Sequence, residues 1–115
     1  MKLPNLEQAF VPSEKITHYL LDTNHDEGHG KAQFFLHVGF SVEQWEVLAQ
    51  ALIRHVNEHE VVKEETRRFG TRFVIEGALS TPNGKKVQLR SVWFTPQGNP
   101  NPRFVTAYPL EEQDG

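Results

Sequence analysis

The chain of 115 residues has the length of one compact domain and leaves little room for a second one. Its apolar fraction of 37% and charged fraction of 23% are those of a globular protein, and no run of eighteen apolar residues is present, so we expect no membrane association. A net charge of −3 argues against general nucleic-acid binding, and the absence of cysteine excludes disulfides and thiolate chemistry.

The charge is unevenly distributed along the chain. Residues 1–60 carry four Lys or Arg against nine Asp or Glu, whereas residues 63–103 carry eight basic against three acidic residues. The second part can attract an anionic ligand, and ordinary surface solvation is the alternative explanation. Residues 1–5 lack the apolar stretch of a secretion signal, so we expect the protein in the cytoplasm.

The N-terminal segment, residues 3–11, has no helical period and is expected to lie extended against the body. Ser13 follows Pro12 as the cap of a short amphipathic helix that ends near Asp22. The apolar side of this helix has residues spaced three and four apart, namely Ile16, Tyr19 and Leu20. The polar, glycine-containing stretch 22–30 is predicted to be a loop.

A second helix is predicted over residues 31–38, with a strongly apolar packing side made of Phe34, Phe35 and Val38. Gly39 terminates it, because glycine readily adopts the left-handed conformation at a helix end. Four histidines in or near the predicted helices are interpreted as surface residues or as core residues with satisfied hydrogen bonds: His18, His37, His55 and His59.

The third helix has the clearest start signal in the sequence. Ser41 caps it, Gln44 returns the capping hydrogen bond, and Phe40 packs on Trp45 as a hydrophobic staple. The helix is predicted to run to about Asn57. Its apolar stripe repeats at intervals of three and four and faces the core: Trp45, Leu48, Leu52 and Val56, with Ala49 and Ile53 beside them.

The remainder of the chain is predicted to form an antiparallel meander of four strands, near residues 61–66, 72–80, 85–94 and 103–108, with a loop at 95–102. The charges of Lys63, Glu64 and Glu65 mark the first strand as an edge strand. Helices followed by strands predict an α+β fold, with two or three N-terminal helices packed on one face of the sheet. We expect a single domain over 1–115, divided into a helical part (1–60), the sheet (61–110) and a flexible tail (111–115).

The turn Thr81-Pro82-Asn83-Gly84 fixes the register of the central hairpin. Its Pro and Gly favour a three-residue loop with a glycine bulge, which pairs Thr81 with Lys85. Counting back from this pair gives an apolar face with the pairs Leu79–Val87, Gly77–Leu89, Ile75–Ser91 and Phe73–Trp93. Trp93 is therefore assigned to the core rather than to base stacking.

The same register places Glu76 directly opposite Arg90 on the other face. These two groups are either a base and a phosphate clamp or merely a cross-strand ion pair. If Val105 and Ala107 of the last strand point inward, Thr106 and Tyr108 share the open face with Arg90. A carboxylate, a guanidinium and two hydroxyls form the equipment for phosphodiester cleavage without a metal; a polar solvent-facing surface is the alternative.

The loop at residues 22–29 contains two histidines and three carboxylates, but their spacing fits no standard metal site. We therefore expect no metal and no cofactor. His25 is a candidate proton carrier, because histidine titrates near neutral pH and this one precedes a predicted helix that begins with Lys31.

Several sequence segments together resemble a small, uncharacterised bacterial domain family. They are Leu20-Leu21-Asp22 with Asn24-His25, Gly30-Lys31-Ala32, Phe34-Phe35, Gly39-Phe40, Pro82-Asn83-Gly84-Lys85, Trp93, and the run from Pro102 to Pro109. Similar domains occur at the C-termini of phage head-morphogenesis and polymorphic toxin proteins. That resemblance implies the barnase, EndoU, colicin and RelE-like ribonuclease fold.

The resemblance also implies a toxin-type, metal-independent endoribonuclease that leaves a 2′,3′-cyclic phosphate. Matching positions assign catalysis to His25, Lys31, Arg90, Thr106 and Tyr108, together with Glu76 from the register, and substrate binding to Arg103. RNA and a restraining protein are the implied partners. Two other readings stay open: an inactive relative, and a non-enzymatic interaction module such as an antitoxin or immunity-like partner. The oligomeric state is not predicted.

Overall fold

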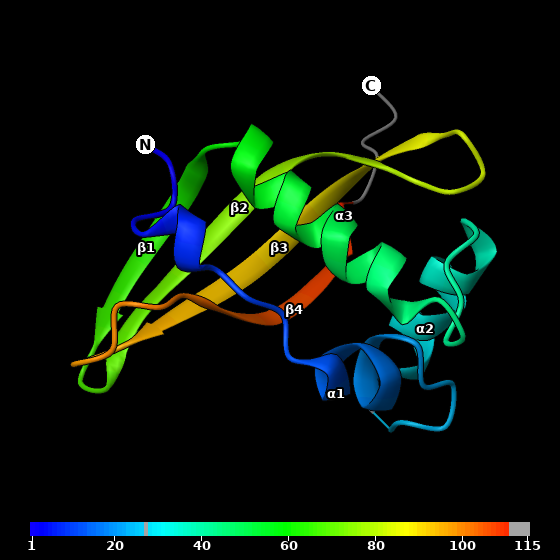
Figure 1. The fold of residues 1–115 in the computed structure, drawn as a ribbon, viewed down its shortest axis with the longest axis horizontal. Helices are drawn as coiled ribbons and strands as arrows, with labels where there is room; N and C mark the ends of the chain where they lie inside the picture. Colours follow the sequence, from blue (N-terminus) through cyan, green and yellow to red (C-terminus); the bar gives the residue numbers. More distant parts are fainter. Residues whose placement is uncertain (27, 111–115) are drawn as a thin grey trace.

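The computed structural model describes residues 1–26 and 28–110, in which helices precede a four-stranded antiparallel sheet (Figure 1). This confirms the predicted α+β class. The sheet is a meander in the order β1-β2-β3-β4. The elements in chain order are η1 (Leu6–Gln8), α1 (Ser13–Lys15), η2 (Ile16–Leu20), α2 (His29–His37), α3 (Trp45–Glu58), β1 (Val61–Arg67), β2 (Gly70–Ser80), β3 (Lys86–Pro96) and β4 (Arg103–Pro109).

Helix α3 lies across one face of the sheet, and α1 and α2 lie together beside β4 (Figure 1). The predicted apolar stripe of α3 is buried at Leu48, Leu52 and Val56, whereas Trp45 is only partly covered. Sheet side chains fill the other side of this core, including Trp93, which has no exposed surface. Burial of this one continuous apolar cluster supplies the main driving force for folding.

The predicted register of the central hairpin is confirmed. Residue pairing between β2 and β3 follows the predicted alignment, with Glu76 opposite Arg90 and Phe73 opposite Trp93. The turn closes through the Thr81 amide, which donates to the Lys85 carbonyl at 3.0 Å, and Gly84 has the positive φ of 85° that the glycine bulge requires. Local turn chemistry therefore determines which residues share each face.

One expectation about β4 is wrong. A bulge between the pairs Val92–Thr106 and Trp93–Phe104 leaves Val105 without a partner in the ladder. An extra residue shifts the side-chain alternation by one position, so Phe104 and Ala107 are both buried and Val105 is only partly covered. Thr106 and Tyr108 still face the same side as Arg90, because they lie after the bulge.

The helix boundaries differ from the predictions in three places. In place of one helix to residue 22, a three-residue α1 is followed by the π-helix η2, which ends at Leu20, and α2 begins at His29 rather than at residue 31. Helix α3 begins at Trp45, four residues after Ser41, although the Ser41 hydroxyl accepts the Gln44 amide at 3.3 Å as a capping residue would. The serine thus closes a preceding turn and not the helix itself.

The N-terminal segment is not wholly extended, because Leu6–Gln8 forms a short 3₁₀ helix. Phe10 then pairs in parallel with Arg103 at the edge of β4. The tail predicted at 111–115 lies outside the described residues. None of the described helices combines the length and apolar character needed to cross a bilayer.

Candidate functional site

The sheet face opposite α3, called here the open face, carries three rows of side chains that run across the strands. Because alternate residues of a strand point to opposite faces, each row contains residues paired in the ladder. The first row is Tyr108, Arg90 and Glu76; the second is Thr106, Val92, Val74 and Lys63; the third is Arg103, Phe94, Arg72 and Glu65.

In the first row, Arg90 joins the other two side chains. Its Nε and Nη2 atoms lie 2.6 and 2.5 Å from Glu76 Oε2, and its Nη1 donates to the Tyr108 hydroxyl at 3.2 Å. The hydrogen bonds to Tyr108 and Glu76 raise the pKa of the Arg90 guanidinium above its usual value. About one third of each partner of the ion pair remains exposed, so a ligand can reach the cation.

A second hydrogen-bonded group forms where α2 and η2 meet β4. Lys31 Nζ donates to the Tyr19 hydroxyl and, at 3.2 Å, to Thr106 Oγ1. The two hydroxyl oxygens are 3.0 Å apart. Because the ammonium can only donate, one hydroxyl must donate to the other, and the three groups form a closed polar triangle.

The two groups are adjacent. Lys31 Nζ lies 5.7 Å from the centre of the Tyr108 ring, and the Arg90 guanidinium carbon lies 5.5 Å from the same ring centre. The structure therefore brings together five residues predicted for the site: Lys31, Glu76, Arg90, Thr106 and Tyr108. Two of these residues, Lys31 and Arg90, are cations, and neighbouring cations can bind one phosphate group.

Tyr19 belongs to this cluster, although its spacing in the sequence predicts a place in the apolar stripe of a helix. Burial would raise the pKa of its phenol, but the hydrogen bonds to Lys31 and Thr106 and the charges of Lys31 and Lys15 together lower it. Tyr19 lies in the π-helix η2, a conformation common at functional sites. The sequence does indicate this role, because a tyrosine at the edge of an apolar stripe can bury its ring and expose its hydroxyl.

His25 lies beside Tyr19, with ring centres 5.1 Å apart in an edge-on arrangement. Its Nδ1 accepts the Gly28 amide at 3.0 Å, which places the proton of the neutral ring on Nε2. Residue 28 must be small, because a Cβ there would lie 2.7 Å from the Tyr19 carbonyl oxygen. His25 thus adjoins the cluster through Tyr19.

Arg103, the predicted substrate-binding residue, does not join this cluster. Its guanidinium carbon lies 5.6 Å from the centre of the Phe94 ring in the third row. One row lies between it and Arg90, a distance of about 13 Å along β3 at the usual rise of a strand. The alternation of β4 predicts Arg103 on the same face as Val105 and Ala107; the bulge instead places it on the open face, at the end away from Arg90.

A groove of about 480 Å³ runs along the open face between β1 and the Tyr108 side of the sheet. This size is within the range of about 300–1,000 Å³ found for ligand clefts. Its lining combines cations, a carboxylate and a tyrosine with two valines: Val62, Lys63, Arg72, Val74, Glu76, Arg90 and Tyr108. Within residues 1–26 and 28–110, no group of three His, Cys, Asp or Glu side chains is placed to hold a metal ion.

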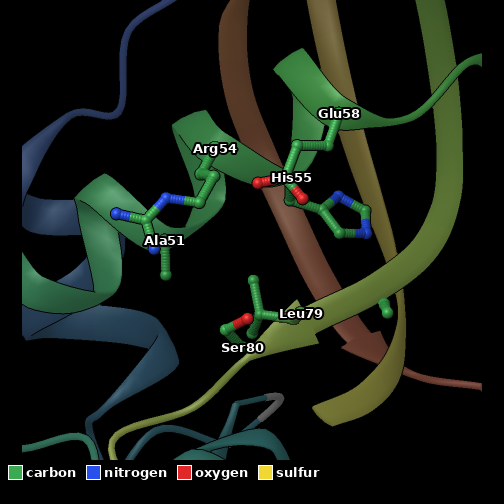
Figure 2. Close-up of a pocket in the computed structure, with 7 residues that line it drawn as sticks. Ala51, Arg54, His55, Glu58, Leu79 and Ser80 are labelled. Carbon is green, nitrogen blue, oxygen red and sulfur yellow. The ribbon is translucent and has the colours of Figure 1, made fainter.

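Polar side chains also gather in a depression between α3 and the end of β2 (Figure 2). His55 projects there from α3 toward the sheet. Its ring bonds to Ser91 Oγ at 3.0 Å and to the Gly77 and Leu89 carbonyls at 3.1 and 3.2 Å. The depression holds about 10 Å³, room for roughly one water, so we assign His55 to the structure of the core.

Comparison with known proteins gives a family and a similar fold. The profile of the family described as Domain of unknown function (DUF6883) matches residues 2–111. No curated protein matches the chain significantly. A chain of the solved contact-dependent growth inhibition toxin–immunity protein complex from Klebsiella pneumoniae 342 has a TM-score of 0.71 and 18% identity, covering 93% of this chain and 97% of that chain. At this identity the likeness concerns the fold alone. Because the family profile extends over nearly the whole sequence, the chain belongs to the DUF6883 family.

Proposed function

We propose that this domain is a toxin-type, metal-independent endoribonuclease whose active site is the first row of the open face with Lys31 and Thr106. One observation carries the proposal: two cations, a carboxylate and three hydroxyls, contributed by five separate elements, form two hydrogen-bonded groups that meet at the Tyr108 ring, and one of these groups lines an open groove. These residues are far apart in the sequence, and packing of the hydrophobic core does not require their polar groups to meet. Such convergence of charged groups is typical of functional sites.

The reaction assigned to the cluster is attack of an RNA 2′-hydroxyl on the adjacent phosphorus. Both Arg90 contacts use Oε2 of Glu76, so Oε1 is the oxygen that takes the 2′-hydroxyl proton. Arg90 and Lys31 bind the non-bridging phosphate oxygens, where negative charge develops. Tyr108 gives its proton to the departing 5′-oxygen, and the products are a 2′,3′-cyclic phosphate and a 5′-hydroxyl end.

Tyr19, Thr106 and His25 have supporting places in this scheme. Tyr19 and Thr106 hold the Lys31 ammonium in position through their hydroxyls. His25 carries its neutral-ring proton on Nε2 and can exchange protons with the site from the Tyr19 side. Arg103 extends phosphate binding along the face.

The fold supports the toxin assignment in a general way. Helices followed by a four-stranded meander match the architecture that the sequence resemblance implies, the barnase, EndoU, colicin and RelE-like ribonuclease fold. The similar solved chain comes from a complex of a growth-inhibition toxin with its immunity protein. We place the action of the domain on RNA in the cytoplasm, where a protein partner would restrain it.

The decisive experiment is incubation of the purified protein with total RNA in EDTA. We expect cleavage with 2′,3′-cyclic phosphate ends, and no cleavage of an oligonucleotide that lacks the 2′-hydroxyl at the scissile position. Arg90→Ala should lower the rate by about 100-fold or more, as loss of one charge-stabilising donor does in other enzymes. Its free energy of unfolding should change by no more than about 1 kcal/mol, because the ion pair is partly exposed.

Arg54→Ala is the matched control, since Arg54 is an exposed arginine on α3, on the opposite side of the sheet. It should cleave RNA at the wild-type rate. Absence of cleavage by the wild type, together with harmless expression in a bacterial host, would sink the enzymatic proposal.

A second function, a non-enzymatic antitoxin or immunity-like module, is favoured by the same structural likeness. The similar complex contains both a toxin and an immunity protein. Under this reading the open face or the charged edge of β1 binds a protein. Tight binding to a toxin without RNA cleavage would support it.

A further inference from the structure

We infer that the tip of the β1–β2 hairpin is a nucleotide-binding subsite, in which Phe69 stacks on a base of single-stranded RNA outside the cleavage position. This inference rests on the proposed function and adds a substrate-binding subsite to it. The starting observation is Phe69 itself, which is 73% exposed and is the most exposed of the large apolar side chains. A single exposed apolar residue is unremarkable in a protein surface, so the argument depends on its surroundings.

The backbone that carries Phe69 is tied to the neighbouring loop. The Phe69 carbonyl accepts the Gln97 amide at 2.9 Å, which ties the turn to the loop after β3. Gly70 follows with φ of +153°, and a Cβ there would lie 2.4 Å from the Thr95 carbonyl oxygen and 2.6 Å from the Phe94 ring. Close backbone packing thus fixes the turn that carries Phe69. A fixed backbone at this position lowers the conformational entropy lost when a base stacks on the ring.

One cation lies against the ring, and others lie on the two strands that the tip connects. The Arg68 guanidinium carbon lies 5.6 Å from the centre of the Phe69 ring, within the range of a cation–π contact. Nearby on β1 and β2, Lys63, Arg67 and Arg72 lie 3.5, 2.6 and 3.0 Å from a single carboxylate, that of Glu65. With Arg68 and Glu64 included, four positive charges against two negative charges leave this end of the sheet cationic. An aromatic ring among cations is the combination that binds single-stranded nucleic acid.

The tip continues the open face. The third row, Glu65, Arg72, Phe94 and Arg103, lies toward the tip. The charged and aromatic lining of a second hollow beside it is Glu14, Lys15, Phe94 and Arg103. From the first row to the tip, β2 covers six residues from Glu76 to Gly70, about 20 Å at the usual rise of a strand. Phe69 is therefore too far from Arg90 to touch the nucleotides that flank the scissile phosphate.

The experiment compares substrates of different length. Binding is measured by fluorescence anisotropy with a labelled, uncleavable 2′-O-methyl RNA of twelve nucleotides. Phe69→Ala should weaken binding by about 5- to 100-fold, the range expected for loss of one stacked base. Phe69→Trp should restore it. Val42→Ala, which shortens an apolar side chain with 42% exposure away from the sheet, should bind as the wild type does.

The kinetic counterpart separates this subsite from the active site. Phe69→Ala should raise KM for long RNA while kcat is unchanged, and it should leave cleavage of a dinucleotide unaffected. Arg68→Ala should lower the slope of log affinity against log salt by about 0.7, as for one phosphate contact with a single strand.

The outcomes test the Phe69 subsite and the proposed ribonuclease function separately. Equal affinity of wild type, Phe69→Ala and Val42→Ala for the long RNA would overturn the subsite, and cleavage by the same proteins would leave the proposed function intact. A wild type that neither binds nor cleaves RNA would refute both. Weakened binding in Phe69→Ala by a protein without nuclease activity would support the subsite and refute the enzyme.

Discussion

The buried imidazole of His55 makes a quantitative prediction about acid stability. Its side chain is 1% exposed, and its Nε2–H donates to the Gly77 and Leu89 carbonyls. Nδ1 must then accept from the Ser91 hydroxyl, whose oxygen accepts the Trp93 indole N–H at 3.0 Å. A second ring proton, on Nδ1, would require the Ser91 hydroxyl to accept from both His55 and Trp93 and to turn its own proton away from the imidazole, and it would place a positive charge in the core.

Burial lowers the pKa of the His55 imidazole, and the nearby charge of His59 acts in the same direction; the Gly77 and Leu89 carbonyls and Glu58 oppose this shift without reversing it. The unfolded chain, with a histidine pKa of about 6.5, therefore binds a proton that the native state resists. Stability from this source is complete above pH 6.5 and is lost as the pH falls. One proton costs about 1.4 kcal/mol per pH unit, so the loss between pH 6.5 and 5 is at most about 2 kcal/mol.

The test is urea denaturation of wild type and His55→Leu at several pH values from 5 to 8, followed by tryptophan fluorescence. At pH 7 the variant should be less stable by about 1–3 kcal/mol, because the Ser91 hydroxyl loses its buried acceptor. The difference between the two proteins should shrink as the pH falls, since only wild type loses the His55 contribution. His37→Gln, at an exposed histidine, should keep a constant difference from wild type. A gap between wild type and His55→Leu that is independent of pH would refute the reasoning.

Two further predictions concern stability and are tested by the same denaturation assay. Gly39→Ala should destabilise the fold by about 1–2 kcal/mol, because φ is +108° there and a Cβ would lie 3.0 Å from Pro82 Cβ; an unchanged midpoint would contradict this. Leu52→Ala, at a fully buried position of α3, should cost about 2–5 kcal/mol, whereas Val47→Ala, on the exposed side of the same helix, should change stability by less than about 0.5 kcal/mol. Similar losses for the two variants would mean that α3 does not pack as described.

The sheet could be predicted in detail because its information is local. Pro82 and Gly84 specify one turn, and a period of two then assigns every neighbouring residue to a face, including Glu76 and Arg90. The helical half was harder to predict. Its short helices carry weak signals, and the start of α3 depends on how the residues after Ser41 pack rather than on the capping pattern alone.

The candidate site shows the same limit. Arg90 and Tyr108 could be related through strand pairing, whereas the contact between Lys31 and Thr106 depends on how α2 docks against β4. Tyr19 was not predicted for the site, because its spacing within an apolar stripe indicates only that its ring packs against the core. Where a hydroxyl ends up depends on tertiary contacts that periodicity does not encode.

Because Val105 is unpaired, the orientation of the side chains in β4 depends on the number of residues in the strand. Val105 shifts the alternation of side chains in the middle of β4. Phe104 can therefore anchor one end of the strand in the interior while Thr106 and Tyr108 present hydroxyls on the open face at the other end. Deletion of one residue here would remove this shift. Either Phe104 would then leave the interior, or the hydroxyls of Thr106 and Tyr108 would turn inward. Related sequences that keep this surface chemistry should therefore tolerate substitutions at this point of the chain far better than they tolerate a change in spacing.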